Sequence, residues 1–236
     1  MTYIKICGIT SSEVAISCFE LGVDMIGLIY YPPSPRHVEV DQAVRILDAV
    51  EKFRNNNGNN KCNGNVDGND IVGKVVLVVF NELPEAIDAR FDYVQIHGKI
   101  SENSISKIGC DIIRVVRDRG EFNNLLSTHN ESDDRIDGGG KVNFLSEQLF
   151  ILELSSGNLP GGNGASWNWG EAKSFCRKFK TFIAGGVSPD NVAQVIKDAD
   201  PFGVDISSGV ESSPAVKDMT KIKKIIDIVK GNKEIR

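Results

Sequence analysis

The chain has 236 residues, 41% of them hydrophobic, and a formal net charge of -5 at pH 7. This length suits one large domain or two small ones, and the acidic balance argues against a broad nucleic-acid or anionic-membrane surface. The five cysteines are scattered and form no C-x-x-C pair, which argues against a zinc knuckle or a disulfide framework. Without a signal peptide or an apolar run of about 18 residues, we expect a cytoplasmic protein that binds neither nucleic acid nor a membrane.

Along the chain, a short Val/Ile-rich run, a turn and a helix-length amphipathic stretch follow one another repeatedly. The predicted strands cover 3–7, 25–30, 73–79, 92–96, 112–116, 149–154, 180–183 and 202–206. The predicted helices lie near 11–21, 40–53, 82–89, 101–109, 119–127, 169–177, 189–198 and 214–229. Apolar strands that alternate with helices predict a parallel sheet covered on its outer face. Eight such units favour an α/β fold with a single (β/α)8 TIM barrel domain over residues 1–236. A doubly wound open sheet is the alternative, because the pattern alone does not prove closure.

Two segments interrupt this rhythm, at about 54–71 and 127–141. The first is rich in Asn and Gly, and the second is acidic and contains three successive glycines near its end. We interpret both as flexible polar insertions. Each follows a helix and precedes a strand, so a barrel would place both on the face opposite the chemistry.

Residues able to do chemistry stand where the predicted strands end. Cys7 ends the first strand, Arg36 lies in the proline-rich loop after the second, and His97 follows the fourth. Glu153 lies at the end of the sixth strand and Asp205 in the eighth. Because the carboxyl ends of barrel strands form the active-site face, we expect these side chains to meet there.

The turns after the seventh and eighth strands predict a phosphate site. Gly185 and Gly186 follow the seventh strand, and Ser207, Ser208 and Gly209 follow the eighth. Glycines let the backbone approach a ligand closely, and free N–H groups suit a phosphate. The loops after these two strands often hold a phosphate in barrels of this kind.

Five segments carry a family resemblance, and they follow one another along nearly the whole chain. They are KICGIT at 5–10, YYPPSPRHV at 30–38, VQIHG at 94–98, AGGVSPDNV at 184–192 and GVDISSGVE at 203–211. On these motifs the chain resembles the phosphoribosylanthranilate isomerases of tryptophan biosynthesis. The resemblance implies a TIM barrel without metal or organic cofactor. It also implies an Amadori rearrangement of N-(5-phosphoribosyl)anthranilate to 1-(2-carboxyphenylamino)-1-deoxyribulose 5-phosphate. We therefore expect a small-molecule phosphosugar substrate, and a monomer or a homodimer.

The same resemblance implies roles for individual residues. Cys7 takes the place of the general base, and Arg36 that of the group holding the anthranilate carboxylate. The family has an aspartate as the general acid after strand 6, where this chain has Glu153 with one methylene more. Asp205 corresponds to a family aspartate near the ribose hydroxyls or the amine. His97 follows a strand, and we expect it to contact the substrate from that position. A thiol needs a basic neighbour to become a thiolate near neutral pH, and Lys5 on the same strand face is a candidate.

Other interpretations stay open. Glu153 could instead pair with Arg114 or Arg117 on the neighbouring strand. At Glu153, Asn163 and Asn168 the chain departs from the family pattern, which has an aspartate, a Thr or Ser and another aspartate there. These changes are also compatible with a drifted, non-catalytic phosphosugar-binding barrel. The related histidine-pathway isomerase pairs two aspartates, the first at the position of Cys7, so it fits less well.

Overall fold

A computed structural model of the chain describes residues 1–56, 73–106, 108–128, 148–154 and 167–231. Most of the two predicted insertions lies outside these residues. Their described margins, 54–56 and 127–128, belong to helices.

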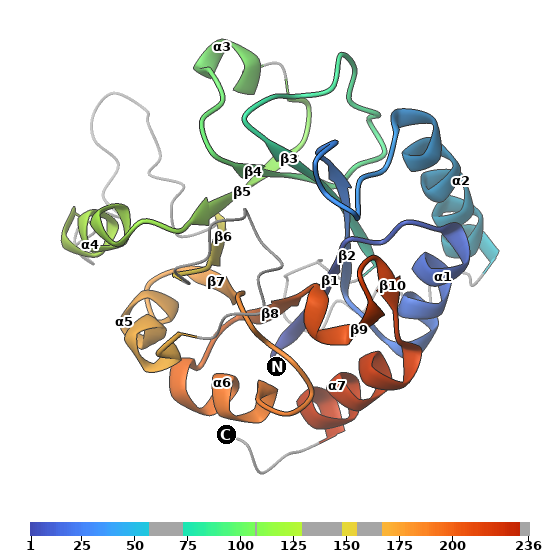
Figure 1. Cartoon of the computed structure of the whole chain (residues 1–236). Helices are drawn as coiled ribbons and strands as arrows, with labels where there is room; N and C mark the ends of the chain where they lie inside the picture. The colour runs from blue at the N-terminus through green and yellow to red at the C-terminus, as the bar shows by residue number, and fades with distance from the viewer. Residues whose placement is uncertain (57–72, 107, 129–147, 155–166, 232–236) are drawn as a thin grey trace.

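Eight parallel strands close into a barrel in chain order (Figure 1). They are β1 (Tyr3–Cys7), β2 (Met25–Tyr30), β3 (Lys74–Phe80), β4 (Tyr93–His97), β5 (Asp111–Val116), β6 (Leu149–Leu152), β7 (Lys180–Ile183) and β8 (Gly203–Ile206). Strands β1 and β8 pair in parallel, with Ile4 opposite Val204, and this pairing closes the barrel. The predicted TIM barrel is confirmed, and the open-sheet alternative is wrong.

The helices surround the barrel on its outside (Figure 1). They are α1 (Ser12–Leu21), α2 (Val40–Asn56), α3 (Glu102–Ile105), α4 (Arg119–Thr128), the 3-10 turn η2 (Trp169–Ala172) with α5 (Lys173–Cys176), α6 (Val192–Ala199) and α7 (Met219–Gly231). After β8 the chain forms a second 3-10 turn, η3 (Ser208–Val210), and a small hairpin of β9 (Glu211–Ser213) and β10 (Val216–Lys217). Within the described residues, no helix combines the length and apolar character needed to cross a membrane.

The sector between β3 and β5 departs from the sequence prediction. The helix predicted over 82–89 is wrong, because residues 81–92 form irregular turns. Asp88 redirects the chain there by accepting the N–H of Arg90 on its side chain and the N–H of Phe91 on its carbonyl. The helix predicted over 101–109 shortens to the single turn α3. Ser101 caps that turn by accepting the N–H of Ser104, and serine competes with helical hydrogen bonding inside so short a segment.

Alternation along the strands divides the core into two parts. On β1, Ile4 and Ile6 pack outward against the helices, whereas Cys7 belongs to a smaller cluster with Met25 and Phe182. Side chains two apart share a face of a strand, so Lys5 and Cys7 both point toward the barrel interior. This arrangement puts a cation directly beneath the thiol.

A polar junction at the other end of the barrel joins the start of the chain to its end. The Asp24 carboxylate accepts the N–H of Ile4 at 2.8 Å and the Lys230 ammonium of α7 at 2.8 Å. Lys230 also donates to the carbonyl of Gly22. These bonds connect β1, β2 and the last helix away from the strand ends that carry the site.

Candidate active site

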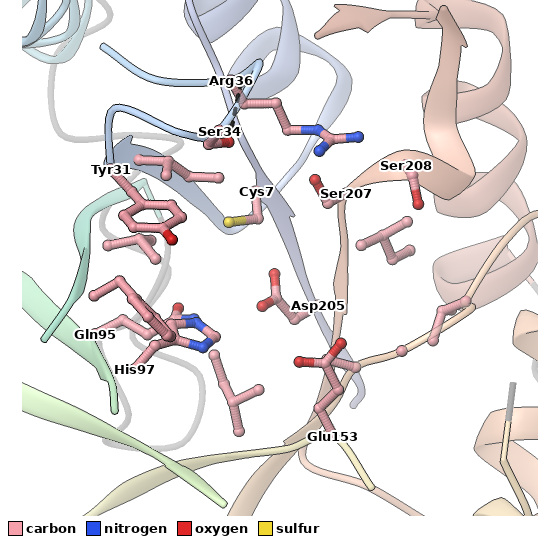
Figure 2. A pocket seen from close by; sticks show the side chains of 18 of the residues that line it. Cys7, Tyr31, Ser34, Arg36, Gln95, His97, Glu153, Asp205, Ser207 and Ser208 are labelled. Carbon is pink, nitrogen blue, oxygen red and sulfur yellow. Dashed lines mark hydrogen bonds between the residues drawn. The ribbon is translucent and has the colours of Figure 1, made fainter. Parts of the chain in front are cut away.

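The site residues predicted from the sequence lie around one pocket at the carboxyl ends of the strands (Figure 2). Those residues are Cys7, Arg36, His97, Glu153, Gly185, Gly186, Asp205, Ser207, Ser208 and Gly209. Tyr31, Ser34 and Gln95 also line the pocket. No role was expected from the sequence for these three residues, although Gln95 stands two positions before His97 and so faces the same side of β4.

The Cys7 thiol lies at the floor of the pocket and is 7% exposed. Gly27 on β2 makes room for it, since a Cβ on Gly27 would lie 2.9 Å from the sulfur. Burial raises the pKa of the thiol above its usual value, and the ammonium groups of Lys5 and Lys217 oppose that rise. Lys5 therefore lowers the pKa of Cys7, as expected for a basic neighbour, but the effect of burial is larger and the net pKa is raised.

Lys5 and Asp205 form a buried ion pair beside the thiol. Lys5 Nζ donates to Asp205 Oδ1 at 2.9 Å, and the lysine side chain is 0% exposed. Burial lowers the pKa of Lys5, but the nearby charges of Asp205 and Cys7 more than compensate, so the net pKa is raised. Lys5 is thus held as a permanent cation below Cys7.

Glu153 directly follows β6, and its N–H continues the strand ladder by donating to the Val116 carbonyl at 3.0 Å. Its carboxylate lies 3.4 Å from Nε of Arg117, while Arg114 pairs with Glu121 on the outer side. Of the two arginines considered from the sequence, Arg117 is therefore the partner. The added methylene fits because position 185 is glycine, whose Cβ would lie 3.2 Å from Glu153 Cγ.

Arg36 reaches the pocket from the loop after β2. Its guanidinium makes two hydrogen bonds to the Glu211 carboxylate, Nε to Oε1 at 2.7 Å and Nη2 to Oε2 at 2.6 Å. Glu211 raises the pKa of Arg36 and keeps the guanidinium charged. Glu211 ends the motif GVDISSGVE, and no role for it was expected from the sequence.

Gln95 and His97 form a buried pair on β4 with unsatisfied polar atoms. The amide nitrogen of Gln95 lies 2.7 Å from Nε2 of His97. Because an amide nitrogen only donates, this orientation of the Gln95 amide makes Nε2 the acceptor and leaves the ring proton on Nδ1. Nδ1 of His97 and Oε1 of Gln95 have no hydrogen-bond partner among the described residues. Burial, Arg117 and Lys5 lower the pKa of His97 to about 3, so the imidazole is neutral at pH 7.

The two predicted phosphate turns have backbones that require glycine. Gly185 and Gly186 have φ values of 87° and 71°, in the left-handed region that other residues rarely adopt. At Gly209 a Cβ would collide with the carbonyl oxygen of Val187, which shows that the two turns pack backbone against backbone. The hydroxyl of Ser207 is buried, with no hydrogen-bond partner in the part of the chain that the structure describes.

The fold and this pocket place the protein among the (β/α)8-barrel enzymes that carry their chemistry at the strand ends. Among the described residues, no group of three or more His, Cys, Asp and Glu side chains is arranged to hold a metal ion.

Comparison with known proteins narrows this class. The profile of the family described as N-(5'phosphoribosyl)anthranilate (PRA) isomerase matches residues 78–228. An N-(5'-phosphoribosyl)anthranilate isomerase from Desulfatibacillum aliphaticivorans is 35% identical over 94% of this chain and 90% of its own length. The crystal structure of phosphoribosyl anthranilate isomerase from Thermotoga maritima has a TM-score of 0.72 at 27% identity, covering 98% of this chain and 100% of that one. A second such structure, in complex with reduced 1-(o-carboxyphenylamino)-1-deoxyribulose 5-phosphate, has a TM-score of 0.67 at 27% identity and the same coverage.

The chain belongs to the N-(5'-phosphoribosyl)anthranilate isomerase family, the isomerases of tryptophan biosynthesis. The resemblance expected from the sequence motifs is confirmed.

Proposed function

We propose that the protein rearranges N-(5-phosphoribosyl)anthranilate to 1-(2-carboxyphenylamino)-1-deoxyribulose 5-phosphate, with Cys7 as general base and Glu153 as general acid. One observation carries this proposal. The Cys7 thiol and the Glu153 carboxylate, which come from β1 and from the end of β6, line the same pocket (Figure 2). The family relationship and the ligand of the related solved structure give additional support.

The rearrangement needs two proton transfers on the sugar. Glu153 in its protonated form donates to the furanose ring oxygen, the bond from that oxygen to C1′ breaks, and a Schiff base forms between C1′ and the anthranilate nitrogen. The Cys7 thiolate then removes the proton from C2′. The resulting enolamine becomes the ketone by gaining a proton at C1′ and losing the proton of the C2′ hydroxyl. A positioned acid and a positioned base suffice for these steps.

The free pocket favours the opposite protonation of the two groups. Burial favours the thiol of Cys7, and the guanidinium of Arg117 favours the carboxylate of Glu153. Transfer of one proton from Cys7 to Glu153 produces the reactive pair without changing the net charge of the pocket. Lys5 and Lys217 favour this transfer because both act on the thiolate.

Substrate binding is assigned to the remaining pocket residues. Arg36 holds the anthranilate carboxylate, because a guanidinium fork suits a planar carboxylate. His97 and Asp205 contact the sugar, while Gly185, Gly186, Ser207, Ser208 and Gly209 hold the phosphate. The rearrangement requires neither a metal nor an organic cofactor. A monomer or homodimer stays our prediction for the assembly.

Turnover is followed by the loss of the anthranilate-ester fluorescence on addition of the protein. The wild type is expected to be active, whereas Cys7→Ser and Glu153→Gln should each lower kcat by about 100-fold or more. Both variants should bind the reduced product analogue within about threefold of the wild type. Cys110→Ser, which changes a half-buried thiol away from the pocket, is the matched control.

The alternative of a non-catalytic phosphosugar-binding barrel gives a different outcome in this assay. A wild-type protein that binds the analogue without turning over substrate would support that alternative. Full activity of Glu153→Gln would refute the role of Glu153 alone.

A further inference from the structure

We propose that Glu211 is a positioning residue, which orients Arg36 so that one edge of its guanidinium faces the substrate carboxylate. The proposal rests on the function proposed above, because it names what makes Arg36 competent for that task. It concerns a residue outside the pocket lining, which acts through Arg36 rather than on the substrate.

The hydrogen bonds divide the guanidinium into two edges. Glu211 occupies the side edge through Nε and Nη2, at 2.7 and 2.6 Å. A guanidinium has five N–H groups, so the end edge, with one parallel N–H from each of Nη1 and Nη2, is left over. Within the described residues, Nη1 makes no hydrogen bond to the protein. The remaining edge has the spacing that a second carboxylate needs for a bidentate contact.

The aliphatic part and the backbone of Arg36 are held by contacts of their own, in addition to those of the guanidinium. A Cβ on Gly8 would lie 2.5 Å from Cδ of Arg36, so the arginine packs directly on the backbone that follows Cys7. The Arg36 N–H donates to the Ser34 hydroxyl at 3.1 Å. The side chain of Arg36 is only 11% exposed. The guanidinium is therefore fixed at both ends and has little rotational freedom left to lose on binding.

Glu211 also connects Arg36 to the turn assigned to phosphate. Lys217 Nζ donates to Glu211 Oε1 at 2.7 Å and to the carbonyl of Ser207 at 3.1 Å. The side chains of Glu211 and Lys217 are 4% and 1% exposed. Lys217, which itself holds the carbonyl of Ser207, thus anchors the carboxylate that orients Arg36.

The charges of this cluster leave a net attraction for an anion. With Arg36 and Lys217 protonated, the cluster has two positive charges and one negative charge, on Glu211, so one positive charge remains uncompensated. Burial lowers the pKa of Lys217, and the hydrogen bond to Glu211 opposes that shift. Hydrogen bonds from Arg36 and Lys217 outweigh burial and lower the pKa of Glu211, which keeps it ionised. Glu211 therefore fixes the geometry of Arg36 without cancelling its attraction for a carboxylate.

The test compares two ligands that differ in one carboxylate. The first is the reduced product analogue, and the second is its counterpart made from aniline, which lacks the ring carboxylate. Dissociation constants are measured for the wild type, Glu211→Gln, Glu211→Asp and Glu121→Gln. Glu121→Gln is the matched control. The Glu121 carboxylate accepts hydrogen bonds from Nε and Nη2 of Arg114 on the outer side of the barrel.

The wild type and Glu121→Gln should bind the carboxylate-bearing analogue about 10- to 100-fold more tightly than the aniline analogue. Glu211→Gln should lose most of this ratio, while its affinity for the aniline analogue changes by less than about threefold. Glu211→Asp retains the negative charge and the salt bridge to Lys217, but its shorter side chain moves the carboxylate away from Arg36. It should give an intermediate ratio of the two dissociation constants. It replaces Glu211→Gln in the test if that variant does not fold.

A Glu211 variant that keeps the wild-type ratio would overturn the proposal. A variant that loses affinity for both analogues equally would also overturn it, since that result indicates a structural role only. The proposed isomerase activity is tested separately, by turnover of the wild type, so failure of one proposal is distinguishable from failure of the other.

Discussion

The guanidinium of Arg117 lies 3.4 Å from the carboxylate of Glu153, at the ends of the neighbouring strands β5 and β6. The segment that follows Glu153, residues 155–166, contains no ionisable side chain. The charged or titratable groups placed around the same pocket are Cys7, Arg36, Tyr31, His97 and Asp205. Among the described residues, Arg117 is therefore the cation that pairs with the proposed acid.

Replacing Arg117 by glutamine should extend the active pH range on its alkaline side. Glu153 must be protonated to act as an acid, and a neighbouring guanidinium favours its carboxylate. Without Arg117 the protonated form persists to higher pH, so the limb of the kcat/KM profile that reports Glu153 should move upward. The activity on the plateau should change by less than about threefold, because Arg117 does not line the pocket.

Arg114→Gln is the control for this measurement, since Arg114 pairs with Glu121 instead. Its pH profile should superimpose on that of the wild type. An Arg117→Gln profile identical to the wild type would mean that the ion pair does not set the protonation of Glu153.

Lys5→Met and Asp205→Asn should shift the reactivity of Cys7 in opposite directions. Lys5 lowers the pKa of Cys7 and Asp205 raises it. Alkylation of Cys7 by iodoacetamide should therefore need a higher pH in Lys5→Met and a lower pH in Asp205→Asn. Peptide mass spectrometry separates Cys7 from Cys18 and Cys176, whose pKa values burial raises to about 12.

Lys5→Met should also cost about 3–5 kcal/mol of stability, because it leaves Asp205 without its buried partner. Denaturant unfolding measures this loss. Shifts of equal sign in the two alkylation profiles would contradict the assigned electrostatics.

The barrel and the position of its site could be predicted from the sequence, because both depend on local patterns. The strands start within one residue of their predicted positions, and the residues at their ends meet as parallel packing requires. The helix over 82–89 could not be predicted correctly. Pro84 left too short a helical segment to be stable alone, and Asp88 captures the chain in a turn.

The side-chain pairs of the site were less accessible to sequence analysis. Lys5 and Asp205 are 200 residues apart, and Arg36 and Glu211 are 175 apart. Whether such side chains touch depends on rotamers and on the stagger of the closed sheet. Only the partners of Glu153 and Cys7 were among the options, because Arg117 directly follows the adjacent strand β5 and Lys5 stands two residues before Cys7 on β1.

Gly209→Ala should weaken phosphate binding. The new methyl group would collide with the Val187 carbonyl, so the two phosphate turns must separate. We expect the dissociation constant of the reduced product analogue to rise about tenfold or more, and the stability to fall by about 1–3 kcal/mol. Gly109→Ala, where no atom lies within 4 Å of the added carbon, should change neither quantity, and equal effects of both variants would contradict this prediction.

His97→Gln should make the stability less sensitive to acid. The pKa of His97 is about 3 in the folded protein, against 6.5 as its ordinary value. Between these values the unfolded chain binds a proton that the folded protein does not. The stability that His97 contributes is therefore fully present above about pH 6.5. It is lost as the pH falls toward 3, by about 1.4 kcal/mol per pH unit. Urea unfolding between about pH 7 and pH 4 should show a shallower slope in the variant, and parallel slopes would contradict a neutral His97.

The junction of Ile4, Asp24 and Lys230 contributes to stability at the end of the barrel opposite the catalytic site. One carboxylate fastens the first strand, the second strand and the final helix, on the side of the barrel remote from the pocket. If these hydrogen bonds break, the first strand and the last helix lose their shared contact, and the barrel can begin to unfold there. Thermal stability can therefore evolve by substitutions at this junction. Turnover depends on the carboxyl ends of the strands and stays unaltered.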